Sequence, residues 1–330
     1  MKVLITGGAG YIGSLLTGIL LQRGYVVIVV DDLLFGGDSL LAYLTHPNFS
    51  FRKANVTEKR AIEPFFNDVD YVIHLAALVG FPACQQVGPQ VAWLYNLQGT
   101  KNVYELAREN KVKRFVFSST YSNYGIAEGD APVTEESPLN PQSIYAETKI
   151  ASEQYLIEQG KNSSTIPVLF RFATLFGLSP RTRFDLIINQ FVLEAIEKRH
   201  LIIYQKNYNR SFVHIRDIAK ALTMALESDI ARVGNQIFNV GSNRGNHTKE
   251  ELIGMIRKYV QGLTIEYKDL TFGGDMRDIK VSFDKIERVL GYKADVTVED
   301  GIRELVEAIQ TKFLYDPHSL RNRNAQFIVQ

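Results

Sequence analysis

A glycine-rich segment near the N-terminus constrains the fold more than any other feature of the sequence. Gly7–Gly13 has glycines at positions 7, 8, 10 and 13; it follows the apolar run Val3–Ile5 and opens the amphipathic segment Tyr11–Arg23. The pattern predicts a strand, a tight turn and a helix. The glycines let the backbone approach a pyrophosphate, which the first N–H groups of the helix can bind. This segment is therefore predicted to bind a dinucleotide.

An acidic pair follows the second apolar run, Val26–Val30. Asp31 stands eighteen residues after Gly13, and Asp32 comes directly after it. An acid at about this distance accepts hydrogen bonds from the ribose hydroxyls of a dinucleotide. No Arg stands beside either acid, and two carboxylates would repel a 2′-phosphate. The expected cofactor is therefore NAD rather than NADP.

Apolar runs alternate with helical segments through the first half of the chain. Further strands are expected at Phe49–Lys53, Tyr71–Leu75, Arg114–Ser118 and Pro167–Arg171, and helices near Glu58–Phe66, Asn96–Glu109 and Ser143–Gln159. This alternation predicts right-handed crossovers and a parallel sheet covered on both faces. We expect an α/β fold with a Rossmann-type doubly wound parallel sheet.

The pattern changes after Pro180, so the domain boundary is expected at Ser179–Arg183. Residues 1–180, with returning segments near 212–241, would form the NAD-binding domain. Residues 181–330 would form a smaller mixed α/β domain for substrate. Its expected helices lie near Phe184–Arg199, after Asp217, and at Lys249–Val260 and Val298–Lys312, with strands at Leu201–Tyr204 and Gln236–Val240. Pro317–Gln330 shows no periodicity, and we expect this segment to be loosely held.

The composition excludes several classes of protein. The 330 residues include 37 Lys and Arg against 36 acidic residues, so the balance gives no electrostatic reason to expect nucleic acid or a membrane surface as a partner. The single cysteine, Cys84, allows no internal disulfide, and no apolar run approaches the ~20 residues of a membrane span. The six histidines show no metal-ligand spacing. We expect a soluble cytoplasmic protein without a metal.

Tyr145 and Lys149 form a candidate catalytic pair. They are four residues apart, so on a helix they lie on one face, one turn from each other. An ammonium near a phenol favours the phenolate, which can act as a general base. Lys149 could also donate a hydrogen bond to the nicotinamide ribose.

Several motifs in this order resemble the extended short-chain dehydrogenase/reductase family, in its branch of NAD-dependent nucleotide-sugar epimerases and dehydratases. The resemblance covers nearly the whole chain. It rests on Thr6–Gly13, His74–Ala77, Asn96–Thr100, Ser118–Thr120, Tyr145 with Lys149, Arg210–Asp217, Phe238–Gly241 and Arg277-Asp278.

The resemblance implies roles for individual residues. Thr120 would hydrogen-bond the reacting sugar oxygen, Tyr145 would be the base, and Lys149 its electrostatic partner and a ribose ligand. The implied cofactor contacts are Gly7, Gly10, Tyr11, Ile12, Asp31, Asp32, Asn55, Val56, Leu75, Ala76, Ala77, Asn96, Ser118, Tyr145 and Lys149. The implied substrate contacts are Val79, Tyr121, Ser122, Asn123, Thr174, Asn189, Arg210 and Arg277, where the two Arg residues would bind the ribose and diphosphate of the nucleotide.

The expected substrate is a nucleotide-diphosphate sugar oxidised at C4, by a 4-dehydrogenase or a 4-epimerase. The 4,6-dehydratases of the branch carry Thr-Asp-Glu, where this chain has Thr120, Tyr121 and Ser122. Without that carboxylate pair, the alternative of 4,6-dehydration is disfavoured. Thr174 stands where 4-epimerases have Asn. The segments Ala76–Cys84 and Phe172–Arg181 resemble a clade that includes GDP-heptose 4-dehydrogenases.

The competing hypothesis from another class is an NAD-sensing interaction protein without catalysis on the same fold. Such proteins usually lack the Tyr or the Lys, and this chain keeps Tyr145, Lys149 and Thr120. The resemblance also implies a homodimer, with Asn96–Glu109 and Ser143–Gln159 at the interface.

Overall fold

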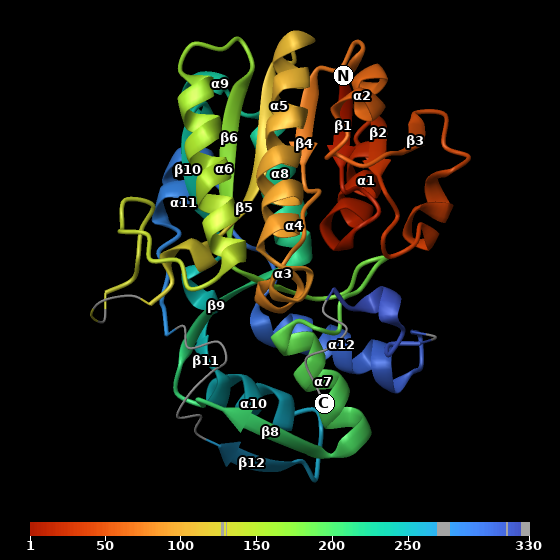
Figure 1. Ribbon diagram of the computed structural model, residues 1–330. Coiled ribbons are helices and arrows are strands. Elements are labelled where there is room, and N and C mark those ends of the chain that lie inside the picture. The colour runs from red at the N-terminus through yellow and green to blue at the C-terminus, as the bar shows by residue number, and fades with distance from the viewer. Residues whose placement is uncertain (127–128, 130, 269–277, 315, 325–330) are drawn as a thin grey trace.

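A seven-stranded parallel sheet organises the computed structural model, which describes residues 1–126, 129, 131–268, 278–314 and 316–324 (Figure 1). Its strand order is β10-β6-β5-β4-β1-β2-β3, and the order reverses between β1 and β4. A crevice therefore opens where the carboxyl ends of these strands diverge. The strands are β1 (Lys2–Thr6), β2 (Val26–Asp31), β3 (Phe49–Lys53), β4 (Tyr71–His74), β5 (Arg114–Thr120), β6 (Ile166–Phe172) and β10 (Gln236–Val240).

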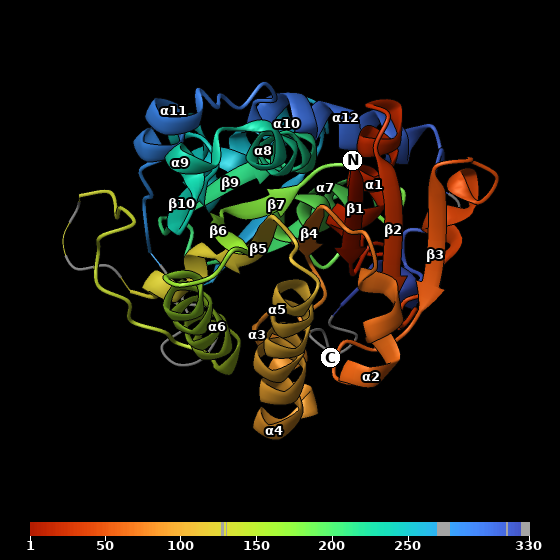
Figure 2. The same ribbon diagram turned by 90° about the horizontal axis from the view of Figure 1, so that it is seen from above.

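Helices cover both faces of this sheet, which is why its central strands β1, β4 and β5 are buried almost throughout. Val3, Leu4 and Ile5 of β1 are completely buried. One face carries α2 (Lys59–Ile62), α5 (Gly99–Glu109) and α6 (Ile144–Gly160); the other carries α1 (Tyr11–Gln22), α8 (Ile215–Glu227), α9 (Ile230–Val233) and α11 (Asp284–Leu290) (Figure 2). The predicted α/β fold with a doubly wound parallel sheet is confirmed.

A smaller group of elements lies below the carboxyl ends of the strands in Figure 1. It contains a mixed sheet of β7 (Thr174–Phe176), β9 (Asn209–His214) and β11 (Asn246–Thr248), and a parallel pair, β8 (His200–Tyr204) and β12 (Thr264–Lys268). Helices α7 (Ile187–Lys198), α10 (Lys249–Arg257) and α12 (Val298–Gln310) pack around a core that includes Phe176, Leu201 and Ile302. β10 and α8 return to the large sheet. The domain division at residue 180 stays a prediction.

Some departures from the expected elements lie around the crevice. Two short helices, α3 (Phe81–Val87) and α4 (Pro89–Trp93), precede a π-helical turn at Leu94–Gln98 that leads into α5. The predicted helix from Asn96 thus begins earlier and is irregular. The helix expected from Phe184 begins at Ile187, after the paired residues Arg183 and Asp185.

The expectation that the C-terminal segment is loosely held is wrong for the part that the structure describes. The Phe184 amide donates to the Asn322 carbonyl at 2.8 Å, and the Asn324 amide donates to Asp185 at 3.0 Å. These contacts join residues well separated in sequence, so no local period could predict them. Residues 325–330 lie outside the described residues. No helix among the described residues is long and apolar enough to cross a bilayer.

Candidate active site

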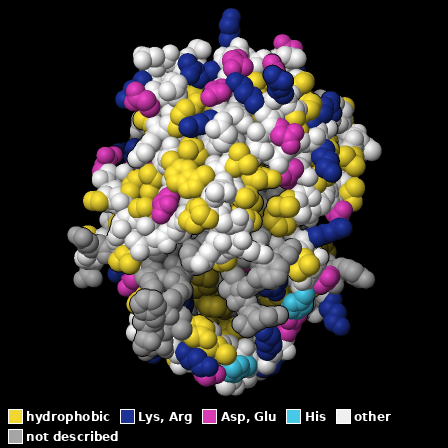
Figure 3. All heavy atoms as spheres, viewed as in Figure 1, with side chains coloured by type: hydrophobic (Ala, Val, Ile, Leu, Met, Phe, Trp, Pro, Cys, Tyr) yellow, Lys and Arg dark blue, Asp and Glu magenta, His cyan; other side chains and the backbone are white. Residues whose placement is uncertain are grey.

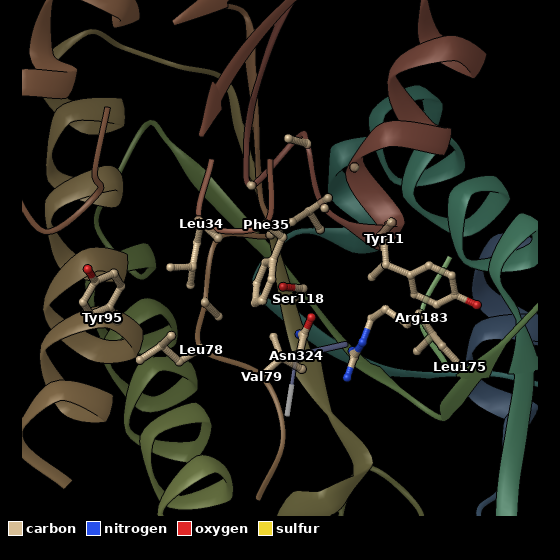
Figure 4. Close-up of a pocket in the computed structure, with 18 of the residues that line it drawn as sticks. Tyr11, Leu34, Phe35, Leu78, Val79, Tyr95, Ser118, Leu175, Arg183 and Asn324 are labelled. Atoms are coloured by element: carbon tan, nitrogen blue, oxygen red, sulfur yellow. The ribbon is translucent and has the colours of Figure 1, made fainter. Parts of the chain in front are cut away.

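One pocket occupies the crevice at the carboxyl ends of β1 and β4. It is lined by the glycine loop, the end of β2, the loop after β4, the end of β5, the start of α6 and the segment after β6. Figure 4 shows its walls, with Tyr95 and Leu78 on one side and Tyr11 and Leu175 on the other. The pocket contains most of the predicted site: Gly7, Gly10, Tyr11, Ile12, Asp31, Asp32, Asn55, Val56, Leu75, Ala76, Ala77, Val79, Ser118, Thr120, Tyr121, Ser122, Tyr145, Lys149 and Thr174.

The glycine loop brings the backbone close to the pocket. Gly7 has φ +74°, and a Cβ there would lie 2.6 Å from the Ala76 nitrogen. A Cβ at Gly13 would lie 2.5 Å from the Gly7 oxygen, so a side chain fits at neither position. Gly10 caps α1 without a side-chain hydrogen bond, which leaves the first N–H groups of the helix for a ligand. The loop thus fits a pyrophosphate.

The acidic pair lies at one end of the pocket. Asp31 accepts hydrogen bonds from the amides of Ala9 at 3.0 Å and Leu33 at 2.8 Å, which fixes its carboxylate beside the glycine loop. Burial raises the pKa of Asp31, and these two hydrogen bonds oppose that rise. Asn55 donates to Tyr95 at 2.9 Å and to Asp32 at 3.4 Å. This end therefore has the polar groups that an adenosine ribose requires.

The catalytic pair lies on the first turns of α6. Ser143 caps this helix by accepting a hydrogen bond from the Ala146 amide at 3.2 Å. Tyr145 and Lys149 are both buried and both line the pocket. The Lys149 ammonium donates to the Ser118 carbonyl at 2.7 Å. Burial lowers the pKa of Lys149 to about 8, so its charge responds to pH in the range where an enzyme works.

The end of β5 places the predicted substrate residues in the same pocket as this pair. Thr120 ends the strand, and its hydroxyl accepts a hydrogen bond from the Ser122 amide at 3.1 Å. The Tyr121 and Thr174 hydroxyls are 2.8 Å apart. All four residues line the pocket. Among the described residues, the carboxylates that line it are those of Asp31 and Asp32, at the end formed by β2.

A buried polar network lies behind these residues. Glu153 of α6 forms a salt bridge with Arg171 of β6 at 2.6 Å, and both side chains are 3% exposed. Glu153 also accepts hydrogen bonds from Ser119 and from Asn123, the latter at 2.9 Å. Asn123 is completely buried in this network and does not line the pocket. The pattern of residues around Tyr145 does not reveal the network, because its members come from elements separated in the sequence: β5 and the turn after it, α6 and β6.

Three other predicted contacts lie away from the pocket surface. Asn96 hydrogen-bonds both backbone groups of Leu78, at 2.8 and 3.0 Å, and so fixes the loop after β4. Asn189 accepts from the Gly177 amide at 3.0 Å and donates to the Arg183 carbonyl at 2.8 Å. Arg210 is buried on β9 and is not among the described residues that line the pocket. Arg277 lies outside the described residues.

Several pocket residues were not predicted. Leu34 and Phe35 follow the acidic pair, Arg181 and Arg183 follow β7, and Asn324 comes from the C-terminal segment. Arg183 makes a paired contact with Asp185, at 3.0 and 2.8 Å. The cluster of basic residues at the expected domain boundary was the one sequence signal that could have indicated Arg181 and Arg183.

Comparisons with known proteins agree with this geometry. A family profile described as the NAD dependent epimerase/dehydratase family matches residues 3–241. A UDP-glucose 4-epimerase of Bacillus subtilis is 29% identical, over 91% of this chain and 94% of that protein. Two solved structures each have a TM-score of 0.83 and cover 95% of this chain. One is a UDP-glucose 4-epimerase from Thermotoga maritima with UDP-glucose, 27% identical and covered completely. The other is a dTDP-glucose 4,6-dehydratase from Streptomyces venezuelae with NAD, 26% identical and 98% covered.

Proposed function

Since the chain belongs to the NAD dependent epimerase/dehydratase family, we propose that it oxidises C4 of a nucleotide-diphosphate sugar without eliminating water. The expectation of an NAD-dependent enzyme that acts on nucleotide sugars is confirmed by the family and by its relatives. The reaction is completed in one of two ways. Hydride returns to the opposite face of the sugar in a 4-epimerase, or the keto sugar leaves in a 4-dehydrogenase.

Tyr145 is the base of this proposal. Its phenolate would accept the proton of the C4 hydroxyl, and Thr120 would hold the same oxygen by a hydrogen bond. Lys149 favours the phenolate because its ammonium lies one helical turn away, buried and held by the Ser118 carbonyl. NAD, when bound, accepts the hydride from C4. The glycine loop and Asp31 would fix its position, and the buried walls would exclude water.

The absence of a carboxylate pair beside Tyr145, among the described residues of the pocket, carries the proposal. Elimination of water needs an acid and a base beyond the phenol that starts the oxidation. The two positions after Thr120 hold Tyr121 and Ser122, and the nearby Glu153 is neutralised by Arg171. The pocket carboxylates Asp31 and Asp32 belong to the adenosine end. 4,6-Dehydration is therefore disfavoured, which supports an oxidation that is not followed by loss of water.

The proposal is tested by measuring, with mass spectrometry, the masses of the products made from a panel of UDP-, GDP- and dTDP-sugars. We expect the converted sugar to have either its original mass, as an epimer, or a mass lower by two hydrogens. Accumulation of NADH accompanies the second outcome and distinguishes the dehydrogenase from the epimerase. A product lighter by one water would overturn the proposal and establish the 4,6-dehydratase alternative.

A further inference from the structure

Arg181 is a buried cation in the pocket whose direct partners are neutral. The residue is 6% exposed. Its Nε donates to the Arg321 carbonyl at 2.9 Å, and one Nη donates to the Asn324 side chain at 2.8 Å. The guanidinium lies 4.0 Å from the centre of the Phe35 ring. Among the described residues Arg181 forms no ion pair, whereas the neighbouring Arg183 is paired with Asp185.

This arrangement is costly without an anionic ligand. A buried charge needs an opposite charge or extensive hydrogen bonding to offset its loss of hydration. Burial lowers the pKa of Arg181 to about 10, and the charge of Arg183 adds to this effect. The guanidinium nevertheless stays charged at neutral pH. The carboxylates that act on it from a distance are Asp185, already paired, and Asp31, already bonded to two amides.

We propose that Arg181 binds the diphosphate of the dinucleotide, and that the C-terminal segment Ser319–Asn324 holds its guanidinium for this purpose. Phe35 follows the ribose-binding Asp31 in the chain, and the glycine loop lines the same pocket. The diphosphate of a dinucleotide lies between its riboses, at the start of α1. Arg181 is thus placed to face the helix N-terminus across the diphosphate, where its planar fork can donate to two phosphate oxygens.

The C-terminal segment connects the two sides of the cofactor pocket. Arg321 forms an ion pair with Asp38, in the loop after β2. Asn322 and Asn324 bind the backbone of Phe184 and the carboxylate of Asp185, on the segment that carries Arg181. Figure 4 shows Asn324 beside Arg183 and below Phe35. The segment therefore joins the loop after β2 to the segment that carries Arg181, and it holds the guanidinium through Arg321 and Asn324.

This inference rests on the NAD dependence of the family and not on the proposed reaction at C4. It would hold even if the reaction on the sugar differed from the one proposed. Conversely, if Arg181 did not bind the diphosphate, the protein could still oxidise a sugar at C4.

The experiment measures dissociation constants by titration calorimetry, on protein freed of copurified nucleotide. The ligands are adenosine, ADP-ribose, 2′-phospho-ADP-ribose and UDP, and the variants are Arg181→Met and the control Arg303→Met. Arg303 is exposed on α12, so its substitution removes the same charge at a position away from the pocket. We expect Arg181→Met to weaken the binding of ADP-ribose about 10- to 100-fold, because hydrogen bonds to a charged group are lost. The affinities for adenosine and UDP should stay unchanged. Arg303→Met should change none of them.

Three results would overturn the proposal. An equal loss for adenosine would show that Arg181 only supports the structure of the pocket. A loss of affinity for UDP, with the affinity for ADP-ribose unchanged, would assign Arg181 to the nucleotide sugar. A larger loss for 2′-phospho-ADP-ribose than for ADP-ribose would assign it to a 2′-phosphate. The role of the C-terminal segment is tested by Asn324→Ala. This substitution should weaken the binding of ADP-ribose in the native protein but not in the Arg181→Met variant. If the two substitutions weakened the binding of ADP-ribose additively, the proposed role of the segment would be contradicted.

Discussion

At the scale of single residues, the chemistry depends on a phenol and an ammonium that are both removed from water. Tyr145 and Lys149 lie on α6, where the carbonyl of Ser118 holds the ammonium at the end of β5. Replacing Tyr145 by Phe removes the base and changes little else in the packing. We expect kcat to fall by about 10²- to 10⁴-fold, because general-base catalysis contributes this much, and dinucleotide affinity to fall far less, because only one hydroxyl contact is lost. Steady-state kinetics with calorimetry checks both. Unimpaired activity in this variant would exclude Tyr145 as the base.

The buried position of Lys149 predicts a dependence on pH. Because burial lowers its pKa to about 8, the ammonium is present below that pH and is lost as the pH rises through it. The phenolate then loses its electrostatic partner, and kcat/KM should fall on the alkaline side. In Lys149→Arg the guanidinium keeps its charge. This variant, though slower, should show no such decline; the same decline in it would assign the titration to another group.

Residues whose role follows from local spacing were the ones that the sequence could predict. The glycine loop, Asp31 and the pair on α6 each stand in a short motif, and all of them line the pocket. Arg181 and Asn324 line it as well, but they meet through contacts between segments far apart in the chain. Asn123 illustrates the opposite error. It stands in the right motif, yet its side chain turns into the buried network with Glu153.

At the scale of elements, the buried pair of Glu153 and Arg171 joins α6 to β6 behind the site. Removing one partner leaves a buried charge unpaired, so Glu153→Leu should lower the free energy of unfolding by about 3–5 kcal/mol. The double variant Glu153→Leu with Arg171→Met should be markedly more stable than the single one. Urea denaturation measures both changes. A double variant as unstable as the sum of its parts would contradict this account of the pair.

The predictability of an element followed from the strength of its pattern. β3 and β10 have the predicted bounds. β1 differs from its predicted bounds by one residue at each end, and α1 by one residue at its C-terminal end, because a continuous apolar run marks β1 and Gly24 marks the end of α1. The helices α3 and α4 and the strand β9 were not predicted. β9 buries Arg210 and Ser211 among its apolar residues, so its composition does not resemble a strand. α3 has Gly at both ends and α4 has Gly at its start, and both have too few residues for a helical period.

At the scale of the whole molecule, the predicted dimer surface is the face that carries α5 and α6. Val87, Val91 and Leu94, which precede α5 in the chain, are exposed, and hydrophobic side chains gather over this part of the molecule in Figure 3. We expect light scattering to give twice the chain mass of 37.3 kDa. The double variant Val91→Glu with Leu94→Glu should be monomeric, since charges are disfavoured in an interface core. The control Leu41→Glu alters an exposed residue elsewhere. A monomeric native protein would refute the dimer.

We propose that Tyr145 starts an oxidation at C4 of the sugar, and isotopic labelling can test this step. The converted sugar of the panel is deuterated at C4 and mixed with the NAD-loaded protein in a single turnover. We predict a slower turnover than with the unlabelled sugar and deuterium on the reduced nicotinamide, with neither signal in Tyr145→Phe. Turnover at an unchanged rate, with no deuterium on the nicotinamide, would contradict it.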